Sequence, residues 1–475
     1  MTNRETVQNA EPRDVLAIFA DLASIPHGSG NTAKVRDYCR DFAERHGCTA
    51  VGDDAGNLVI RVPASAGYEG HAPVMLQGHL DMVCEKTADK TIDFLNDPLT
   101  LVLDGDELHA DRTTLGGDDG IAVAMILAII ADKSLAHPPL EAVFTTDEET
   151  GMCGAAALDC SALKSRVLIN LDSEEESTVW VACAGGMRAD VTLPLTFEAE
   201  ARPACRVTLG GLAGGHSGSE IDKGRQNATR LLATALKPLP VRLCSLEGGL
   251  ADNAIPREAS AVVCGDTEAI SAALAAFADE IRADACAEDK NLTVTVAPTA
   301  PARPMTEDAA ARVLGFVTGA PNGVQAMSRD IEGLVQTSLN LGIARTGDSA
   351  QTVSFSLRSS VGEEKEALYR ELCACAQSFG GTVSRYGDYP AWEYSEHSPL
   401  RELYARTYER VVGRPCAVKA IHAGLECGIF YEKMNAPDSI SVGPDMRDIH
   451  TPQETLFLPS VRRVYAVVKE VLCAL

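Results

Sequence analysis

Three short apolar segments of this chain each run directly into acidic or histidine side chains. They are residues 74–78, 140–146 and 167–171. Short β-rich apolar runs with polar boundaries predict strands. In an open α/β sheet, ligand-binding side chains collect beyond the carboxyl ends of the strands, where loops from distant parts of the sequence meet. The pattern therefore predicts an α/β fold with a polar site along one edge of its sheet.

Side chains that can bind a metal ion occur at five separated places. They are His79 and Asp81, Asp118 and Asp119, Glu148 and Glu149, Asp172, and His450. Neutral imidazole and carboxylate oxygen are both good ligands for zinc and similar divalent ions. Each place also has an ordinary explanation, because strand-end polar groups can bond to the backbone and paired glutamates can face water. Together they favour a hydrolytic metal site.

The bulk properties of the chain limit its class and its partners. Its 475 residues, 45% of them hydrophobic, are enough for a large core and for two domains. The formal net charge of −25 and a pI near 4.8 argue against sequence-independent nucleic-acid binding, which depends on clustered Lys and Arg. We therefore expect no nucleic-acid partner.

The sequence also predicts a cytoplasmic protein with no membrane partner. Residues 1–13 are polar and lack the apolar core of a signal peptide, and the longest apolar run, 121–131, is too short to span a bilayer. The fifteen cysteines are scattered in a chain too long to need disulfide bonds for stability. Free thiols in a reducing compartment are the expectation.

The order of the candidate ligands resembles that of a known family. The segments that carry the resemblance are 77–81, 117–120, 146–150, 171–173 and 448–450. Their order is similar to that in the co-catalytic di-zinc metallopeptidases, which include carboxypeptidase G, aminoacylase and the cytosolic dipeptidases. The resemblance covers nearly the whole chain. Segments 215–220 and 421–428 look most like the aminoacylhistidine dipeptidase branch, the carnosinase-like Xaa-His dipeptidases.

This resemblance implies an α/β fold of the zinc-peptidase type, with a mixed central sheet flanked by helices. An α+β lid and dimerisation domain is expected to interrupt it at residues 186–383. Because His450 would have to rejoin the N-terminal ligands, the catalytic domain is predicted to be discontinuous, with segments 1–185 and 384–475. Helices are expected at 12–22, 31–46, 121–130, 227–236, 267–286, 307–317 and 363–379, and further strands at 57–62, 205–209 and 259–264.

The resemblance also implies a centre of two divalent ions, with zinc as the first choice and cobalt or manganese as alternatives. His79 and Asp172 would hold one ion, Glu149 and His450 the other, and Asp118 would be shared, with the peptide bond after it in the cis form. The chain has Asp-Asp-Gly where many relatives have Asp-Asp-Lys. Asp119 could equally cap the helix that follows, because Asp before an apolar helix accepts free N–H groups.

Three residues are assigned catalytic roles by the same resemblance. Glu148 would be the general base, and Asp81 would orient the second ring nitrogen of His79. His216 would stabilise the negative charge that develops on the substrate, from a partner subunit in similar proteins. We therefore expect a homodimer, with an exposed loop histidine as the plain alternative for His216.

Recognition of a small peptide substrate is assigned to the inserted domain. Arg358 would bind the free carboxylate of a dipeptide through the paired donors of its guanidinium, unless it is an ordinary surface arginine. Asn253 and Gly424 are expected to contact the rest of the substrate.

The predicted function is metal-dependent hydrolysis of dipeptides, preferentially Xaa-His, by a water that two metals activate. An aminoacylase or a broader di- or tripeptidase is the enzymatic alternative. A metal-retaining regulatory scaffold is the non-enzymatic one, and it would show a broken ligand set or a lost Glu148, whereas all are present here. A serine hydrolase is disfavoured, since the sequence at 215–219 lacks the final glycine of a nucleophile elbow. Cys427 is expected to be a buried structural thiol.

Overall fold

The computed structural model describes all residues 1–475, and the chain divides into two compact units. Unit 1 is formed by Met1–Ala182, Tyr394–Ala420 and Leu425–Leu475, and unit 2 by Cys183–Glu393 and Ile421–Gly424. Unit 2 runs beyond residue 383, the predicted end of the insertion, because β19 (Thr382–Tyr389) pairs with β9 (Gly185–Pro194). None of the helices is both long and apolar enough to cross a membrane.

The core of unit 1 is a mixed sheet, as the sequence predicts. Its strand order is β1 (Thr49–Gly52), β2 (Leu58–Val62), β6 (Leu140–Thr145), β3 (Val74–His79), β7 (Val167–Asn170), β21 (Asp438–Ser441), β8 (Thr178–Cys183) and β20 (Ala417–Ile421). The central strands β6, β3, β7 and β21 are parallel, while β1 and β2 are antiparallel to their neighbours. β3 and β6 are buried along their whole length, as expected for strands covered on both faces.

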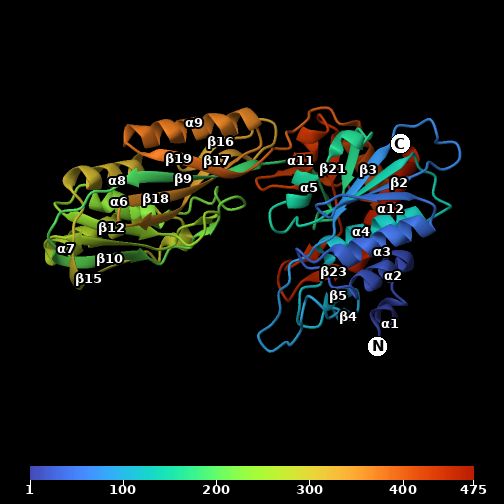
Figure 1. The fold of residues 1–475 in the computed structure, drawn as a ribbon, viewed down its shortest axis with the longest axis horizontal. Coiled ribbons are helices and arrows are strands. Elements are labelled where there is room, and N and C mark those ends of the chain that lie inside the picture. Colours follow the sequence, from blue (N-terminus) through green and yellow to red (C-terminus); the bar gives the residue numbers. More distant parts are fainter. The chain divides into compact units, whose positions relative to one another are not determined.

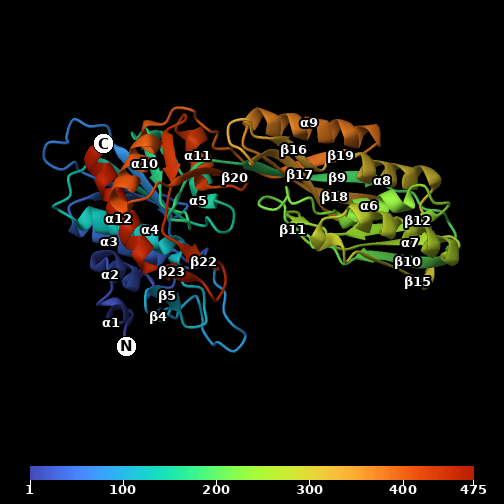
Figure 2. The same ribbon diagram turned by 180° about the vertical axis from the view of Figure 1, so that it is seen from behind.

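Helices pack on this sheet where the apolar periodicity predicts them. Predictions at 12–22, 31–46 and 121–130 correspond to α2 (Arg13–Leu22), α3 (Ala33–Arg45) and α4 (Gly117–Ala131). α4 is buried on all sides because it packs against both β3 and α2, and α3 lies beside it (Figure 1). The remaining α-helices of unit 1 are α1 (Asn3–Val7), α5 (Cys153–Ala157), α10 (Pro399–Val412), α11 (Glu426–Lys433) and α12 (Leu458–Ala474). Figure 2 shows α10 beside α12.

A small antiparallel sheet returns the C-terminal segment to the N-terminal part of unit 1. Its order is β22 (Met446–Arg447), β23 (Thr455–Phe457), β5 (Glu107–Ala110) and β4 (Leu101–Asp104). Thr455 lies opposite His109, so the loop between β22 and β23 reaches the start of α4. His450 is in that loop, which explains how a late residue joins the early ligands.

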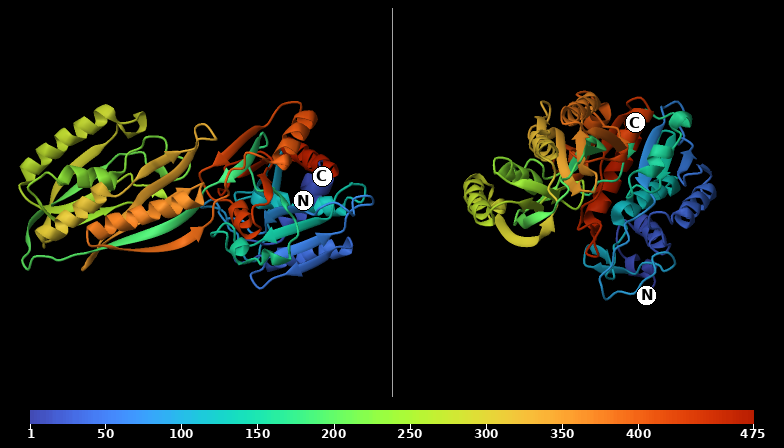
Figure 3. Two further views of the ribbon diagram at one scale, coloured as in Figure 1. Left: turned by 90° about the horizontal axis from the view of Figure 1, so that it is seen from above. Right: turned by 60° about the vertical axis from the view of Figure 1, so that its left-hand side comes forward.

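Unit 2 is a separate α+β layer structure with its own core. Its antiparallel sheet has the order β15 (Thr293–Ala302), β10 (Arg202–Gly210), β14 (Ala259–Cys264), β12 (Arg242–Gly248), β17 (Val335–Thr346), β18 (Ala350–Ser359), β9 and β19, with β16 (Gly323–Met327) on β17. Helices α6 (Ala228–Leu236), α8 (Glu307–Gly319) and α9 (Gly362–Ser378) pack on it, and α7 (Thr267–Asp284) packs on β15 (Figure 3).

All four predicted helices and both predicted strands of this region are present, but the long strands β17 and β18 were not predicted. Buried polar residues such as Thr337, Ser338 and Asn340 interrupt their apolar pattern.

Candidate metal centre

The carboxyl ends of three neighbouring parallel strands carry the first candidate ligands. His79 is the last residue of β3 and pairs in register with Thr145 at the end of β6. Glu148 and Glu149 follow β6, and Asp172 follows β7, which pairs with β3 on its other side. The predicted convergence at one edge of the sheet is therefore confirmed.

Asp118 joins this edge from the start of α4. Gly116 has a left-handed backbone, with φ of 66°, and the peptide bond between Asp118 and Asp119 is cis, as the resemblance implied. The turn brings Oδ1 of Asp118 to 3.1 Å from Nε2 of His79. The same nitrogen lies 3.6 Å from Oδ1 of Asp172. His79, Asp118 and Asp172 thus form one group of three.

His450 forms a second group on the other oxygen of the same aspartate. Its Nε2 lies 3.0 Å from Oδ2 of Asp118 and 3.0 Å from Oε1 of Glu149. The two carboxylate oxygens of Asp118 therefore face two different histidines. This is the arrangement expected of a ligand that two ions share, and all five predicted ligands lie in it.

The distances within both groups suit divalent ions. Two ligands about 2.1 Å from one tetrahedral zinc ion lie about 3.4 Å apart, which is within the observed spread of 3.0–3.6 Å. Oε1 of Glu149 is buried and accepts no hydrogen bond despite the nearby imidazole. Imidazole and carboxylate are also the donors that zinc, cobalt and manganese accept. The residues present therefore fit such ions.

The histidines and carboxylates around Asp118 shift one another's pKa values. The carboxylates of Asp118 and Glu149 raise the pKa of His450 to about 10. Burial would raise the pKa of Asp118, but hydrogen bonds from His450 and His79 outweigh burial and hold that pKa well below its usual range. Imidazole must be neutral to bind a metal, so loading the site must release these protons.

Glu148 lies beside both groups without belonging to either pair of predicted ligands. One of its carboxylate oxygens is within 4.8 Å of the ligand atoms of His79 and Glu149. Burial, and then the charges of Asp172, Glu426 and Glu149, raise its pKa well above the usual value, while His79 opposes the shift. A half-buried carboxyl in this position is a suitable proton acceptor once cations offset the negative charge.

Asp81 fixes the loop that carries Glu148 and Glu149. Its Oδ1 accepts the N–H of Glu148 at 3.0 Å, and its Oδ2 accepts the N–H of Glu149 at 3.3 Å and the hydroxyl of Ser29 at 2.8 Å. Nδ1 of His79 lies 2.9 Å from the backbone oxygen of Asp81 and 3.6 Å from its Oδ1. Asp81 therefore faces the ring nitrogen mainly through its backbone, and its carboxylate holds the neighbouring loop.

Asp119 does not cap the helix, which was the role that the sequence offered for it. The helix start has no side-chain cap, and Oδ2 of Asp119 instead accepts the backbone N–H of His79 at 3.1 Å. A Cβ on Gly78 would lie 2.5 Å from this oxygen. The glycine is therefore required for the close approach of α4 to β3, and Asp119 fixes the backbone of a candidate ligand.

A buried polar network beneath the ligands was not predicted. Asn170 donates to Gln77 at 2.6 Å, and Gln77 and Thr145 each donate to Oε2 of Glu426 at 2.6 Å. Burial raises the pKa of Glu426 to about 7. The available signal was polar Gln77 and Asn170 inside strands that are otherwise apolar, because buried polar groups in a strand require partners.

The predicted substrate residues all belong to unit 2. The N–H groups of Gly218 and Ser219 both donate to Nδ1 of His216 at 3.2 Å. Nδ1 is therefore the unprotonated nitrogen, and Nε2 carries the hydrogen as a donor. Burial, followed by the Arg358 guanidinium, lowers the pKa of His216 and keeps the ring neutral. Glu220 accepts the backbone N–H of His216 at 2.8 Å.

Arg358 is buried, so it is not the ordinary surface arginine of the alternative prediction. Nη1 donates to the hydroxyl of Tyr389 at 3.2 Å, while Nε is buried without a partner. His422 lies nearby, where burial and then this guanidinium lower its pKa to about 3. A buried cation with free donors is suited to bind a carboxylate.

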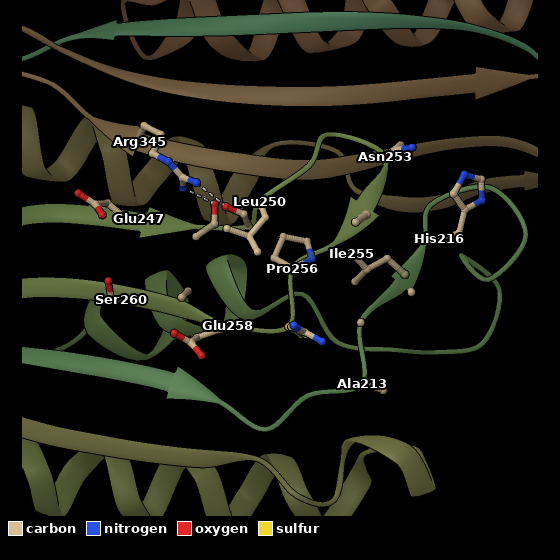
Figure 4. Close-up of a pocket in the computed structure, with 17 residues that line it drawn as sticks. Ala213, His216, Glu247, Leu250, Asn253, Ile255, Pro256, Glu258, Ser260 and Arg345 are labelled. Carbon is tan, nitrogen blue, oxygen red and sulfur yellow. Dashed lines mark hydrogen bonds between the residues drawn. The ribbon is translucent and has the colours of Figure 1, made fainter. Parts of the chain in front are cut away.

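Asn253 directly precedes β13 (Ala254–Ile255), which pairs with β11 (Gly215–His216), so Asn253 lies close to His216. The side chain of Asn340 holds the Asn253 loop by donating to the backbone oxygens of Asp252 and Ala254, both at 2.9 Å. A cavity of about 730 Å³ is lined by His216 and Asn253, among other residues. Figure 4 shows His216 and Asn253 on one side of it and Glu247 on the other. Gly424 ends the Ile421–Gly424 segment of unit 2.

Clustered histidines and carboxylates at the carboxyl edge of a mixed α/β sheet define a metal-dependent hydrolase. The chain belongs to peptidase family M20/M25/M40, whose model matches residues 75–474. It is 36% identical to the cytosol non-specific dipeptidase of Escherichia coli, over 97% of each chain. Its structure is similar to that of the aminoacylhistidine dipeptidase from Vibrio alginolyticus, with a TM-score of 0.92, 32% identity and coverage of 99% and 98% of the two chains.

Proposed function

We propose that this chain is a metal-dependent dipeptidase that hydrolyses Xaa-His dipeptides in preference to others. The arrangement around Asp118 carries the proposal, because its two oxygens lie 3.1 Å from Nε2 of His79 and 3.0 Å from Nε2 of His450. The names of the two relatives support a dipeptide substrate, and that of the Vibrio protein supports histidine as its second residue.

The proposed cofactor is a pair of divalent ions, with zinc first and cobalt or manganese as alternatives. His79 and Asp172 would hold one ion, Glu149 and His450 the other, and Asp118 both. When bound, these ions would supply an acidified water and a polarised scissile carbonyl. The donor set and the spacing of the ligand atoms support this assignment.

The residues around the ions then perform the proton transfers. Glu148 accepts the proton of the attacking water and passes it to the amine of the leaving amino acid. Asp81 keeps Glu148 in place through the N–H at 3.0 Å. Such a positioned base contributes about 10²- to 10⁴-fold to a rate.

Unit 2 is proposed to supply substrate recognition. Arg358 would bind the terminal carboxylate, Asn253 and Gly424 would contact the rest of the peptide, and Nε2–H of His216 would donate to the developing oxyanion. The neutral tautomer of His216 supports this role. We also propose that residues 186–383 act as the lid and form a homodimer, and that the protein is cytoplasmic like its named relative.

The test is a substrate panel with metal-reconstituted protein. Xaa-His, Xaa-Leu and N-acetyl amino acids would be compared for wild type and for Glu148→Ala, with free amino acids quantified directly. Bound metal is measured in both proteins, so that loss of the base is separated from loss of the ions.

Selective Xaa-His cleavage that falls about 10²- to 10⁴-fold in Glu148→Ala at unchanged metal content is the expected result. Equal cleavage of Xaa-Leu would replace the histidine preference with a broad dipeptidase. Preferential deacetylation would assign an aminoacylase, and no turnover with both ions bound would contradict an enzymatic role.

A further inference from the structure

A single buried carboxylate organises the backbone that leads into Asp118. Oε2 of Glu454 accepts the N–H groups of Leu115 at 2.7 Å and Gly116 at 3.2 Å. Its Oε1 accepts those of Gly117 at 2.8 Å and Asp118 at 3.3 Å. Only 2% of Glu454 is exposed, so its carboxylate is buried against these four backbone N–H groups.

This contact replaces the usual cap of a helix start. The N–H groups at the start of a helix have no partner within the helix and are normally satisfied by a capping side chain. Here Gly116 has no side chain to offer, and Asp118 and Asp119 have backbone angles outside the helical range. Successive N–H groups that point to one side form a concave anion site, and Glu454 fills it.

Glycine is needed on the backbone side of this contact. A Cβ on Gly117 would lie 3.1 Å from Oε1 of Glu454, and Gly116 has φ of 66°. The carboxylate of Glu454 therefore lies directly against the backbone of the turn at Leu115–Asp118. A shift of either one would move the other.

Glu454 connects the two groups of candidate ligands. It is four residues beyond His450, in the same loop between β22 and β23. One short segment thus supplies a ligand of the second group and fixes the backbone of Asp118, which belongs to both groups.

We propose that Glu454 is a positioning residue, which holds Asp118 so that its two oxygens are presented to two ions at once. The proposal rests on the proposed function, because it concerns the same metal centre. It predicts that the charge and the length of Glu454 determine metal affinity, although Glu454 itself contacts no ion.

The sharpest variant is Glu454→Gln. Glutamine has nearly the same shape, but one oxygen is replaced by an NH₂ group, which is a donor and would face two backbone N–H groups. Two of the four hydrogen bonds are lost and replaced by repulsion, so the turn at Leu115–Asp118 must shift.

Glu141 provides a matched control in the same unit. It is also buried, and its carboxylate accepts the N–H groups of Lys164 and Ser165 and the hydroxyl of Ser165, at 2.6–3.1 Å. It lies near the start of β6, whereas the ligands follow the other end of that strand. Glu141→Gln should therefore lower stability without changing the metal centre.

The experiment measures zinc affinity, the absorption spectrum of the cobalt-loaded protein, kcat and KM for a dipeptide, and unfolding by urea. In Glu454→Gln we expect zinc affinity to fall about 10- to 100-fold, the cobalt spectrum to change, and kcat to fall more than KM rises. Glu141→Gln should retain wild-type affinity and spectrum. If Glu454→Gln does not fold, Glu454→Asp is used, and its affinity should lie below that of wild type.

Wild-type zinc affinity and cobalt spectrum in the Glu454 variant would overturn the proposal and leave only a structural role. The same loss of affinity in Glu141→Gln would overturn it too, since the effect would then come from general destabilisation. Failure of the wild type to bind metal or cleave dipeptides would instead contradict the proposed function, so the two failures are distinguishable.

Discussion

At the scale of single residues, the chemistry of the side chains supplied candidate ligands, and the family resemblance chose among them. Few side chain types bind zinc, and the resemblance assigns His79, Asp172 and His450 as ligands; the structure brings these three together around Asp118. Glu426 and Glu454 could not be selected in this way, because residue type alone does not distinguish a buried carboxylate that accepts hydrogen bonds from a solvated one. Their roles depend on partners more than 280 residues away in sequence.

Arg358 gives a prediction about the terminal carboxylate of the substrate. Arg358→Lys should reduce kcat/KM for a dipeptide about 10- to 100-fold, because lysine lacks the paired donors of a guanidinium. The same dipeptide with an amidated C-terminus should lose much less. The measurement is kcat/KM for both substrates in both proteins.

Arg230→Lys is the control for this comparison, since Arg230 is a half-buried arginine of unit 2 that donates to backbone oxygens at the end of α8. It should not change the ratio of kcat/KM for the free and amidated peptides. An equal loss for both substrates in Arg358→Lys would contradict carboxylate binding.

His422 gives a prediction about pH. Burial and the nearby Arg358 lower its pKa from 6.5 to about 3, so the unfolded chain binds more protons than the folded one between these values. Stability must then decrease as the pH falls below 6.5. The expected loss between pH 7.5 and pH 5 is about 2 kcal/mol from this residue.

The measurement is urea unfolding of the full-length protein at both pH values for wild type and His422→Gln. Glutamine can still bond to Ser338, the partner of His422 at 2.7 Å, but does not titrate. Between the two pH values, His422→Gln should lose less stability than wild type, by the contribution given above for His422. An identical pH dependence in the two proteins would count against a neutral buried His422.

At the scale of elements, apolar periodicity predicted α2, α3 and α4 closely, while β17 and β18 were missed. Strands and helices are found from sequence when burial and polarity agree, as in α4, which is buried on all sides. In β17 the buried residues Ser338 and Asn340 bond to His422 and to the Asn253 loop. Their polarity follows from tertiary contacts that no local pattern contains.

The packing of α4 on β3 can be tested at Gly78. A Cβ there would lie 2.5 Å from Oδ2 of Asp119 and 3.1 Å from Cβ of Ala122. Gly78→Ala should therefore separate the two elements, with a loss of unfolding free energy of about 1–3 kcal/mol and weaker zinc binding. Urea unfolding and zinc titration measure these effects.

Gly70→Ala is the control, because a Cβ at Gly70 has no heavy atom within 4 Å and its backbone is not left-handed. We expect a change within about 0.5 kcal/mol there. Equal effects at the two glycines would show that close packing at Gly78 is unimportant.

At the scale of the whole molecule, the discontinuous catalytic domain was predictable only through the need for His450 to join the early ligands. His450 is brought to these ligands by the pairing of β23 with β5, and β23 is too short to be recognised from the sequence. The predicted ligands fall in unit 1 and the predicted substrate residues in unit 2.

Metal binding should therefore stabilise the two units differently. An ion that binds only the folded state adds about 2.7 kcal/mol at a free concentration one hundred times its Kd. Hydrogen exchange followed by mass spectrometry should show slower exchange in β3, β6 and β7 on addition of zinc. The core strands β9 and β18 should change little, and the Asp118→Asn variant should show a smaller effect. Equal stabilisation of both sets of strands would contradict an ion site built within unit 1.

Sharing of Asp118 by two ions, as proposed above, can be measured by titrating zinc into metal-free protein while bound metal and dipeptide hydrolysis are followed on the same samples. We expect no hydrolysis without metal, activity that reaches its maximum at two bound ions per chain, and the loss of both ions in Asp118→Ala. Full hydrolysis with one bound ion or with none would contradict the proposed sharing.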